Sequence, residues 1–551
     1  GEVVALSVAR LHAGMQKQTA LRLSEVNLLV VTDVHSFLAA HLHADGMCGV
    51  ERCDASFGAL LSFVQHLRAA GDKQGKDVFF FDNGDVVDGT GLSSATPVHG
   101  KAVLPLLTSL PLDALNCGNH ELYQSRTVLE GLLGTVGPRP SFVGSWNGTY
   151  LTSNIVLASS GAPLGSRFAL LKGRHGTRLL VLGWLYEMRD HCAAVNVTPI
   201  AAAVSEPWFA AAMAHAAHVD AIVVLAHMHY ADPLVGEMLA AIRRAVGPAV
   251  LVQVLAGHSH IRASARLDAR AAVLEAGHYA DTVGFASFNA SRGVSLHHSF
   301  VHEYVHMSRA SLAAAAGVAA AAFDTPAGLA LSRRIDETRD ALGVSTALGC
   351  APRTYRASAP LGADDSLWSL YLDVVAPAAL FTPARNASQC FLTSTGALRY
   401  DLYAGRVTRD DVAMVLPFED RLWVVQARGD VISKALASLN SGSAGGEDGE
   451  EGERPLRAEQ AALPRYAATP SALAPEQLFD AIVGDFDRDA VAGAIRTAGG
   501  AAVGPPVRYD KAAVAARSIA PPQTDTDAWL RWARTLPQPP CGSPPVGVAS
   551  R

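Results

Sequence analysis

The sequence lacks a long basic run, and it lacks an apolar run of the length that crosses a bilayer. The formal net charge is −6, from 45 Lys and Arg against 51 Asp and Glu. A nucleic-acid polymer or an anionic membrane surface is therefore not the expected partner. The best candidate for a membrane span, Ala310–Phe323, is Ala-rich and falls short of the ~20 residues that a span needs. We expect no transmembrane segment, and a phosphorylated ligand would need a local site.

Cysteine is scarce as well, and no spacing among the seven cysteines is typical of a zinc site. An odd number leaves at least one cysteine unpaired within the chain. Cys117 and Cys192 are compatible with buried thiols. The candidate disulfide pairs are Cys48 with Cys53 and Cys350 with Cys390.

Four triplets fit the acceptor pattern for N-glycosylation. Such triplets also arise by chance, but four of them together with the cysteines favour a protein that is secreted or that resides in the secretory or vacuolar pathway. The acceptor residues are Asn147, Asn196, Asn289 and Asn386.

Between residues 26 and 300, the sequence repeats an order of apolar run, polar tip and helical segment. Val26–Thr32 is an apolar run of strand length that ends at Asp33, and comparable runs end near residues 85, 119, 227 and 258. This order predicts a layered α/β domain whose polar residues gather at the carboxyl ends of the strands, where ligands usually bind. A second α/β domain is expected further along the chain. The expected segments are an N-terminal extension (1–25), the first domain (26–305), a bridging helical linker (306–345), the second domain (346–535, with a disordered acidic loop at 441–455) and an irregular tail (536–551).

The polar residues that follow these predicted strands comprise two carboxylates, one amide and four imidazoles. This set suits two divalent transition ions about 3.5–4 Å apart that share a bridging carboxylate. Asp85 is the natural bridge, since it lies between the other ligands in chain order. A hydroxide held by both ions would be the nucleophile, because cations lower the pKa of bound water. The first ion would take Asp33, His35, Asp85 and His260, and the second would take Asp85, Asn119, His227 and His258.

His120 is left outside the metal ligands, beside the substrate. It could stabilise the transition state or protonate the leaving oxygen, and the adjacent Glu121 could orient it. Taken singly, residues of these types have ordinary explanations, such as an Asp in a turn or His227 as a hydrogen-bonded core histidine. We interpret His41 and His43 as residues of an exposed loop.

The polar tips form five blocks, in order, that resemble the motifs of the calcineurin-like metallophosphoesterases. The resemblance covers about residues 26 to 300. It implies a layered β-sandwich domain flanked by helices, two divalent metal ions (Zn, Mn, Fe, Co or Mg), the ligand roles given above and the hydrolysis of phosphoesters. Glu121 departs from the commoner Asp of the family. The blocks are Asp33-Val-His35, Gly84-Asp85-Val-Val-Asp88, Gly118-Asn119-His120-Glu121, His227 and Gly257-His258-Ser-His260.

The second domain resembles the carboxyl-terminal substrate domain of 5′-nucleotidases. The matching segments are Gly396-Ala-Leu-Arg399 and Pro417-Phe418-Glu-Asp420. The resemblance implies that Arg399 pairs with the substrate phosphate and that Phe418 stacks on a nucleobase. The candidate for a second stacking aromatic is Phe486, in Gly484-Asp485-Phe486.

These patterns predict a dinuclear metal-dependent phosphohydrolase that acts on nucleotides in the manner of a 5′-nucleotidase. One alternative keeps the metal site and acts on phosphoproteins, lipid or sugar phosphates, or diesters. Another is a non-catalytic binding protein that kept the fold, and the intact ligand set argues against it. In the enzymatic cases the partner is a small phosphoester, and the sequence gives no indication of the oligomeric state.

Overall fold

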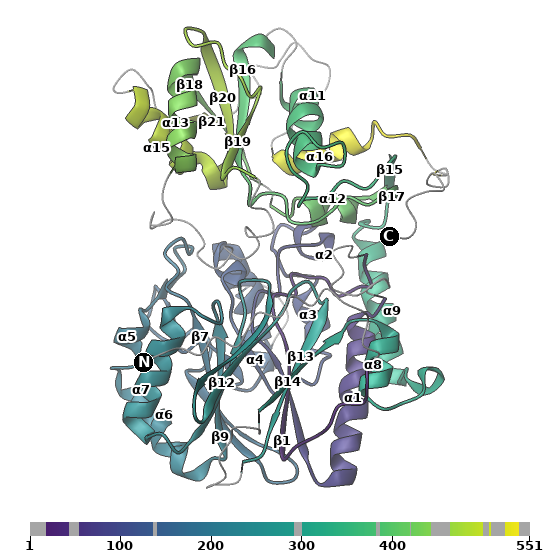
Figure 1. Ribbon diagram of the computed structural model, residues 1–551, viewed down its shortest axis with the longest axis vertical. Coiled ribbons are helices and arrows are strands. Elements are labelled where there is room, and N and C mark those ends of the chain that lie inside the picture. The colour runs from purple at the N-terminus through teal and green to yellow at the C-terminus, as the bar shows by residue number, and fades with distance from the viewer. Residues whose placement is uncertain are drawn as a thin grey trace. The chain divides into compact units, whose positions relative to one another are not determined.

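The computed structural model describes residues 18–42, 54–135, 140–290, 300–381, 386–418, 420–441, 463–499, 506–508, 524–538 and 541. Its contacts divide the chain into two compact units (Figure 1). The first unit holds the described residues of Gly1–Asp88 and Thr96–Thr338. The second holds the described residues of Gly89–Ala95, Arg339–Glu450 and Arg457–Arg551.

Two six-stranded sheets form the centre of the first unit. In the first sheet, β1 to β4 are parallel, and the two remaining strands add antiparallel at the β1 side. In the second sheet, four parallel strands are flanked by an antiparallel strand at each edge. The first sheet has the order β14 (Val301–His306), β13 (Thr282–Phe288), β1 (Val26–Val31), β2 (Asp77–Asp82), β3 (Ala114–Asn116) and β4 (Tyr150–Leu151). The second has the order β11 (Arg262–Asp268), β12 (Ala271–Ala276), β10 (Leu251–Ala256), β9 (Ala221–His227), β7 (Arg178–Leu185) and β6 (Phe168–Lys172).

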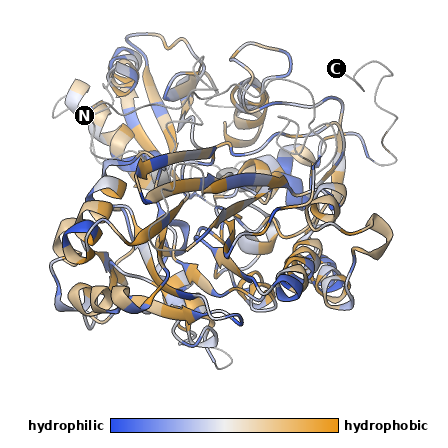
Figure 2. Ribbon diagram, turned by 60° about the horizontal axis from the view of Figure 1, so that its bottom comes forward, coloured by the Kyte–Doolittle hydropathy of each residue, from blue (hydrophilic) through white to orange (hydrophobic). Residues whose placement is uncertain are grey.

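The inner strands are buried over their whole length because they are apolar on both faces. All six residues of β1 and all seven of β9 are buried. One face of each sheet contributes to a shared core that includes Leu28, Phe81, Val181 and Leu255. Figure 2 shows orange, hydrophobic stretches along many of the strands. The two sheets therefore form a sandwich.

Helices cover the outer faces of the sandwich (Figure 1). One helix packs on β2 of the first sheet, and three helices share a hydrophobic core with β7, β9 and β10 of the second. This order of layers confirms the predicted layered β-sandwich flanked by helices. The helices are α1 (Phe57–Gln74) on the first sheet, and α5 (Ile200–Ala203), α6 (Pro207–Met213) and α7 (Pro233–Val246) on the second.

The segment predicted as a bridging linker, 306–345, contains α8 (Arg309–Ala315) and α9 (Pro326–Ala341). Both helices pack beside α1. A Cβ atom added to Gly58 of α1 would lie 2.2 Å from the carbonyl oxygen of Gly328 in α9. The two helices therefore need glycine at this crossing, and most of the segment is packed on the first unit.

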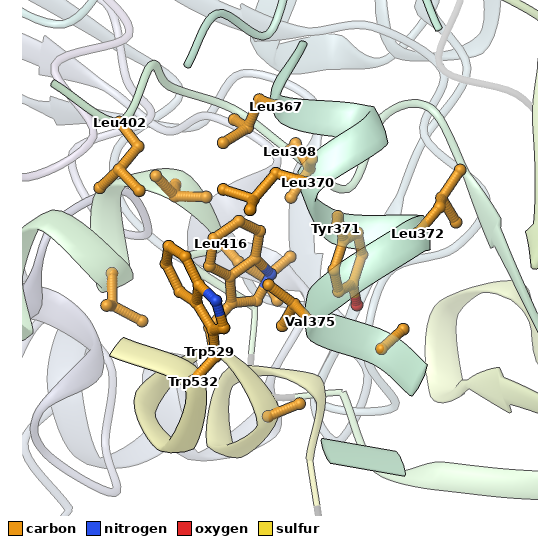
Figure 3. Close-up of a cluster of buried hydrophobic side chains, with 14 of the residues drawn as sticks. Leu367, Leu370, Tyr371, Leu372, Val375, Leu398, Leu402, Leu416, Trp529 and Trp532 are labelled. Carbon is orange, nitrogen blue, oxygen red and sulfur yellow. The ribbon is translucent and has the colours of Figure 1, made fainter. Parts of the chain in front are cut away.

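A mixed five-stranded sheet forms the centre of the second unit, as the predicted second α/β domain requires. Two helices, α13 (Gly429–Ser441) and α15 (Asp485–Gly499), share one core with the sheet. A second core contains Trp529 of α16 (Asp525–Ala533), whose ring lies 5.3 Å from that of Tyr371 (Figure 3). The strand order is β19 (Tyr466–Thr469), β16 (Gln389–Ser394), β20 (Leu478–Gly484), β18 (Leu422–Arg428) and β21 (Val507–Arg508).

The cysteine pairing of the second unit differs from the prediction. Cys350, in β15 (Ala347–Ala351), forms a disulfide bond with Cys541. The predicted pair of Cys350 with Cys390 is wrong, because Cys390 is a buried free thiol in β16. Cys117 is also a buried free thiol.

Some predictions fall on residues outside the described ranges. They include the pair of Cys48 with Cys53 and nearly all of the acidic loop, of which only Ser441 is described, as the last residue of α13. The described part of the N-terminal extension, 18–25, contains no helix or strand. None of the helices in the described ranges combines the length and hydropathy of a membrane-spanning segment.

Replacing Cys350 and Cys541 together with Ala is expected to destabilise the second unit. The bond joins residues 191 positions apart, and the chain-entropy model gives such a loop about 5 kcal/mol of stabilisation. Differential scanning calorimetry should show a lower unfolding temperature for the double variant, whereas Cys192→Ala, which removes a free thiol, should unfold like the wild type. Equal unfolding of the double variant and the wild type would contradict this assignment.

Candidate metal centre

The seven predicted metal ligands meet at the carboxyl ends of strands from both sheets. Parallel strands bring their carboxyl ends to one edge, so Asp33 and His258, which are 225 positions apart, come into contact. All seven side chains are buried, with at most 5% relative exposure. Asp33 and His35 follow β1, Asp85 follows β2, Asn119 follows β3, His227 ends β9, and His258 and His260 follow β10.

Left-handed backbone conformations aim several of these side chains. Asp33, His35 and Asp85 have φ angles of 51°, 44° and 57°, and His258 and His260 have φ angles of 72° and 61°. Such values are uncommon for residues other than glycine and cluster at functional sites. Hydrogen bonds hold the turns in place, as between the amide of His35 and the carbonyl of Asp85 at 2.9 Å.

Two motif glycines let the turns after β2 and β3 touch. A Cβ atom on Gly84 would lie 2.4 Å from the amide nitrogen of Gly118, and a Cβ atom on Gly118 would lie 2.1 Å from Oδ1 of Asp85. Any side chain at either position would push the two turns apart. Glycine is therefore required where the blocks of these two strands meet.

The first group of ligand atoms comes from Asp33, His35 and His260, which lie within 4.8 Å of one another. Nε2 of His35 lies 3.1 Å from Nε2 of His260. Nε2 of His260 lies 3.6 Å from Oδ1 of Asp33. Asp85 adjoins this group, since its Oδ2 lies 3.8 Å from Nε2 of His35.

The second group comes from Asp85, His227 and His258, again within 4.8 Å. Nε2 of His227 lies 3.0 Å from Oδ2 of Asp85 and 3.1 Å from Oδ1 of Asn119. Oδ2 of Asp85 thus faces both groups. Asp85 therefore lies between the two groups, at the position predicted for a bridging carboxylate.

Backbone carbonyls fix the tautomers of two histidines in a form suited to metal binding. Nδ1 of His35 lies 2.7 Å from the carbonyl oxygen of Asp88, and Nδ1 of His227 lies 2.9 Å from that of Asn83. A carbonyl only accepts hydrogen bonds, so each Nδ1 carries a proton, and each Nε2 is the ring atom that faces the cluster and can bind a cation once it is deprotonated. The imidazole and carboxylate ligands fit divalent transition ions.

The charges of this buried cluster demand compensation. Burial raises the pKa of Asp33 to about 6. Burial alone would lower the pKa of His227, but Asp85 and Asp33 beside it raise that pKa to about 10. Protons and cations therefore compete for the same ligand atoms, which is typical of metal sites built from carboxylate and imidazole.

Glu121 contacts the backbone rather than His120. Its carboxylate accepts hydrogen bonds from four amides at 2.8–3.2 Å. Burial, followed by the nearby charge of Asp85, raises the pKa of Glu121 to about 7. Glu121 thus ties the turn after β2 to the turn after β3. The amides are those of Asp85, Val86, Val87 and Gly118.

Glu121→Gln is expected to lower the stability of the metal-free protein by about 2–4 kcal/mol, because a side-chain amide offers one acceptor oxygen to four buried donors and turns its own NH₂ group towards others. Thermal unfolding after chelation should show the loss. Glu130→Gln, at a carboxylate paired with Arg126 on the surface, is the matched control. If Glu121→Gln unfolded at the same temperature as the control, these contacts of Glu121 would be contradicted.

The carboxylate that contacts the ring of His120 is that of Asp88. Oδ2 of Asp88 lies 3.1 Å from Nδ1 of His120, and its Oδ1 accepts a hydrogen bond from Nδ1 of His99. The amide of His120 donates to Oδ1 of Asp85 at 2.8 Å. The expectation that Glu121 orients His120 is therefore corrected by these contacts. Asp88 stood in the second sequence block without a role, and no sequence pattern pointed to His99.

The second unit brings two of the three predicted substrate residues together. The guanidinium of Arg399 lies over the ring of Phe418, 5.7 Å from its centroid. Gly484 approaches the same segment, because a Cβ atom on it would lie 3.2 Å from Cβ of Asp420. The side chain of Phe486 lies outside the described part of the chain, although its backbone belongs to α15.

His41 differs from its interpretation as an exposed residue. Its side chain has 5% relative exposure, and Nε2 lies 3.7 Å from Oδ1 of the buried Asp281. Its ring also contacts Phe37 edge-on at 5.0 Å. His41 is therefore packed into the first unit, and His43 lies outside the described residues.

Comparisons with known proteins agree with this fold. Residues 26–262 match the calcineurin-like phosphoesterase family, and residues 354–486 match the NAD nucleotidase C-terminal domain. An uncharacterized protein of Schizosaccharomyces pombe is 29% identical over 428 residues, which cover 72% of this chain and 69% of that protein. A secreted protein of Arthroderma benhamiae is 26% identical over 467 residues, covering 77% of this chain and 68% of that protein.

The fold of the whole chain also has a counterpart among solved structures. A 5′-nucleotidase from Candida albicans superposes with a TM-score of 0.81 at 21% identity, covering 94% of this chain and 99% of that one. Calcineurin-like phosphoesterases use a dinuclear metal site, and the buried Asp and His groups supply candidate ligands for one. Residues 26–262 are a calcineurin-like phosphoesterase domain by their family match, which supports a hydrolase of phosphoester bonds, and the fold of the chain is that of the 5′-nucleotidases.

Proposed function

We propose that this enzyme is a two-metal phosphohydrolase that releases phosphate from nucleotides, with nucleoside mono- or diphosphates as substrates. The observation that carries the proposal is the gathering of seven buried ligands into two groups that share Asp85. Asp33, His35, Asp85 and His260 would hold one ion. Asp85, Asn119, His227 and His258 would hold the other.

Divalent ions at such a site lower the pKa of bound water and neutralise the negative charge that develops on the phosphoryl group. The chain's own groups do the rest. His120 lies beside the ligand atoms, since one of its ring nitrogens is within 4.8 Å of the ligand atoms of His35 and Asp85. In this proposal His120 assists the leaving oxygen, and Asp88 holds its ring through Nδ1.

The second unit supports nucleotides as the substrate class. The stacked pair of Arg399 and Phe418 combines a cation that binds phosphate with an aromatic face that stacks on a base. The match of residues 354–486 to the NAD nucleotidase C-terminal domain covers both residues. The fold shared with a 5′-nucleotidase is consistent with this assignment.

A second candidate function acts on phosphoesters that carry no base, such as phosphoproteins, lipid or sugar phosphates, or diesters. It is favoured by the turn that should supply the second stacking aromatic, because Gly484-Asp485-Phe486 lacks the full pattern of the family. In this turn the carboxylate of Asp485 is engaged by the chain itself, since Nε1 of Trp423 donates a hydrogen bond to its Oδ1.

Phosphate release across a substrate panel separates the two candidates. The panel contains AMP, other nucleoside mono- and diphosphates, glycerol phosphate, a phosphopeptide and bis-p-nitrophenyl phosphate, each with Mn²⁺, Co²⁺ or Zn²⁺. The nucleotide proposal expects the highest kcat/KM for a nucleotide, and it expects Phe418→Leu to raise KM for that nucleotide but not for p-nitrophenyl phosphate. A preference for the phosphopeptide or the diester supports the second candidate, and absence of release with every metal contradicts both.

We further propose that the protein is secreted or resides in the secretory or vacuolar pathway. Three acceptor asparagines, Asn147, Asn196 and Asn289, have exposed side chains. A disulfide bond in the second unit and the secreted relative support the same location. Treatment of the protein from a eukaryotic host with a peptide N-glycosidase should lower its mass, and an unchanged mass would contradict glycosylation.

A further inference from the structure

Asp88 is a buried carboxylate whose two oxygens contact two different histidines. Oδ2 lies 3.1 Å from Nδ1 of His120, and Oδ1 accepts from Nδ1 of His99. The relative exposures are 5% for Asp88, 4% for His120 and 6% for His99. A continuous series of hydrogen bonds therefore runs from His99 through Asp88 to His120, and it ends beside the metal ligands.

A carboxylate held at one oxygen keeps rotational freedom about its Cβ–Cγ bond. A second hydrogen bond from the opposite side fixes the plane of the group and, with it, the direction in which the first oxygen points. The backbone of Asp88 has a φ of 57°, in the left-handed region, where residues persist when surrounding contacts hold them. His99 supplies such a contact from a different turn of the chain.

The chain path adds a reason for a contact at this place. Asp88 is the last residue of the first unit before residues 89–95, which belong to the second unit, and the chain re-enters the first unit at Thr96. His99 lies three residues after Thr96. The hydrogen bond between Asp88 and His99 thus joins the two stretches of chain that flank residues 89–95. Asp88 is therefore held by a residue of its own unit.

We propose that His99 is a positioning residue for the phosphohydrolase reaction, acting through Asp88 to hold the ring of His120 at the leaving oxygen of the substrate. The proposal rests on the proposed function. In the assisted step a water oxygen forms a bond to phosphorus and releases its proton to the solvent, while the bond between phosphorus and the leaving oxygen breaks. The electron pair of the broken bond stays on the leaving oxygen, and His120 donates a hydrogen bond or proton to it. In this proposal His99 acts only through Asp88.

The test compares two substitutions at His99. His99→Phe keeps a ring and removes the donor to Asp88, whereas the side-chain amide of His99→Asn can donate in place of Nδ1. Each variant is assayed in the full chain, at equal metal content, with AMP and with 2,4-dinitrophenyl phosphate. An alkyl leaving oxygen needs assistance and a dinitrophenolate does not, so a positioning role affects the two esters differently.

We expect His99→Phe to lower kcat/KM for AMP about tenfold to a hundredfold, to change kcat/KM for 2,4-dinitrophenyl phosphate little, and to be rescued largely by His99→Asn. His175→Asn is the matched control, since His175 pairs with Asp72 at the surface of the same unit. Equal losses for the two esters, no loss for either, or no rescue by Asn would overturn the proposal.

Crystal structures of the wild type and of His99→Phe give a readout that does not depend on activity. The proposal expects the carboxylate of Asp88 to leave Nδ1 of His120 in the variant and to stay within hydrogen-bond distance of it in the wild type. A carboxylate that keeps its contact without His99 overturns the positioning claim. If the wild type hydrolyses neither ester, the proposed function fails, and the two crystal structures still decide whether His99 positions Asp88.

Discussion

Asp85→Asn should lower phosphate release by about a thousandfold and should also lower the amount of metal bound. The several kcal/mol that metal ions contribute to a phosphoryl-transfer transition state correspond to a factor of this size. Oδ2 of Asp85 faces both ligand groups, at 3.8 Å from Nε2 of His35 and 3.0 Å from Nε2 of His227. The side-chain amide of Asn is uncharged. It therefore lacks the anionic oxygen with which Asp85 would bridge two cations.

The measurement pairs kcat/KM for AMP with metal analysis of the same protein sample. Asp72→Asn is the control, because Asp72 pairs with Arg174 and His175 away from the metal centre and should match the wild type in both measurements. An Asp85→Asn protein that binds and hydrolyses like the control would mean that Asp85 does not hold the two ions.

His120→Asn should lower kcat for AMP by about 10²–10⁴-fold while leaving the metal content unchanged. The side chain of His120 contacts Asp88 through Nδ1 at 3.1 Å, and its ring meets that of His35 edge-on at 4.6 Å. Its predicted task is assistance to the leaving oxygen, which affects turnover more than binding. Stopped assays with AMP, together with metal analysis, check both parts of the expectation.

Glu121→Gln provides the contrast for His120→Asn. If Glu121 oriented His120, both variants would lose kcat in the same way and keep their stability. The four amide contacts of Glu121 predict instead that its variant loses stability and metal affinity first. Similar kinetic losses without any loss of stability would contradict the structural assignment and restore the orienting role of Glu121.

The sequence was sufficient to predict that the seven candidate ligands lie close together, and the reason lies in its strands. Continuous apolar runs of strand length such as Val26–Val31 are typical of inner strands of a sheet covered on both faces. Polar residues directly after such strands must gather at one edge. Asp33 follows a strand of the first sheet, and His227 ends a strand of the second. The two side chains therefore come within 3.7 Å of each other, although neither strand's sequence indicates that the two strands are close.

The contacts of His120 could not be predicted in the same way, because neighbours in the chain need not be neighbours in space. His120 and Glu121 begin a short 3₁₀ helix, His120–Leu122, in which successive side chains point about 120° apart. Glu121 therefore turns towards the backbone of the β2 and β3 turns. The partner of His120 comes instead from Asp88, 32 positions earlier.

The disulfide illustrates a different limit. Cysteine spacing carries no information about connectivity, and the pair of Cys350 with Cys541 depends on how α16 packs beside β15. A Cβ atom on Gly349 of β15 would lie 2.5 Å from Cβ of Leu536, just beyond α16. That packing brings the last part of the described chain next to Cys350, which no local pattern near Cys541 indicates.

The most direct test of the two-metal account measures bound metal and phosphate release on the same sample of the full chain. The protein is stripped with a chelator and then titrated back with Mn²⁺, with AMP or, if AMP is not cleaved, p-nitrophenyl phosphate as the substrate. The account predicts that release disappears with the metal and returns as occupancy approaches about two ions per chain. Release that persists in the stripped protein, or that is complete at one ion per chain, would contradict it.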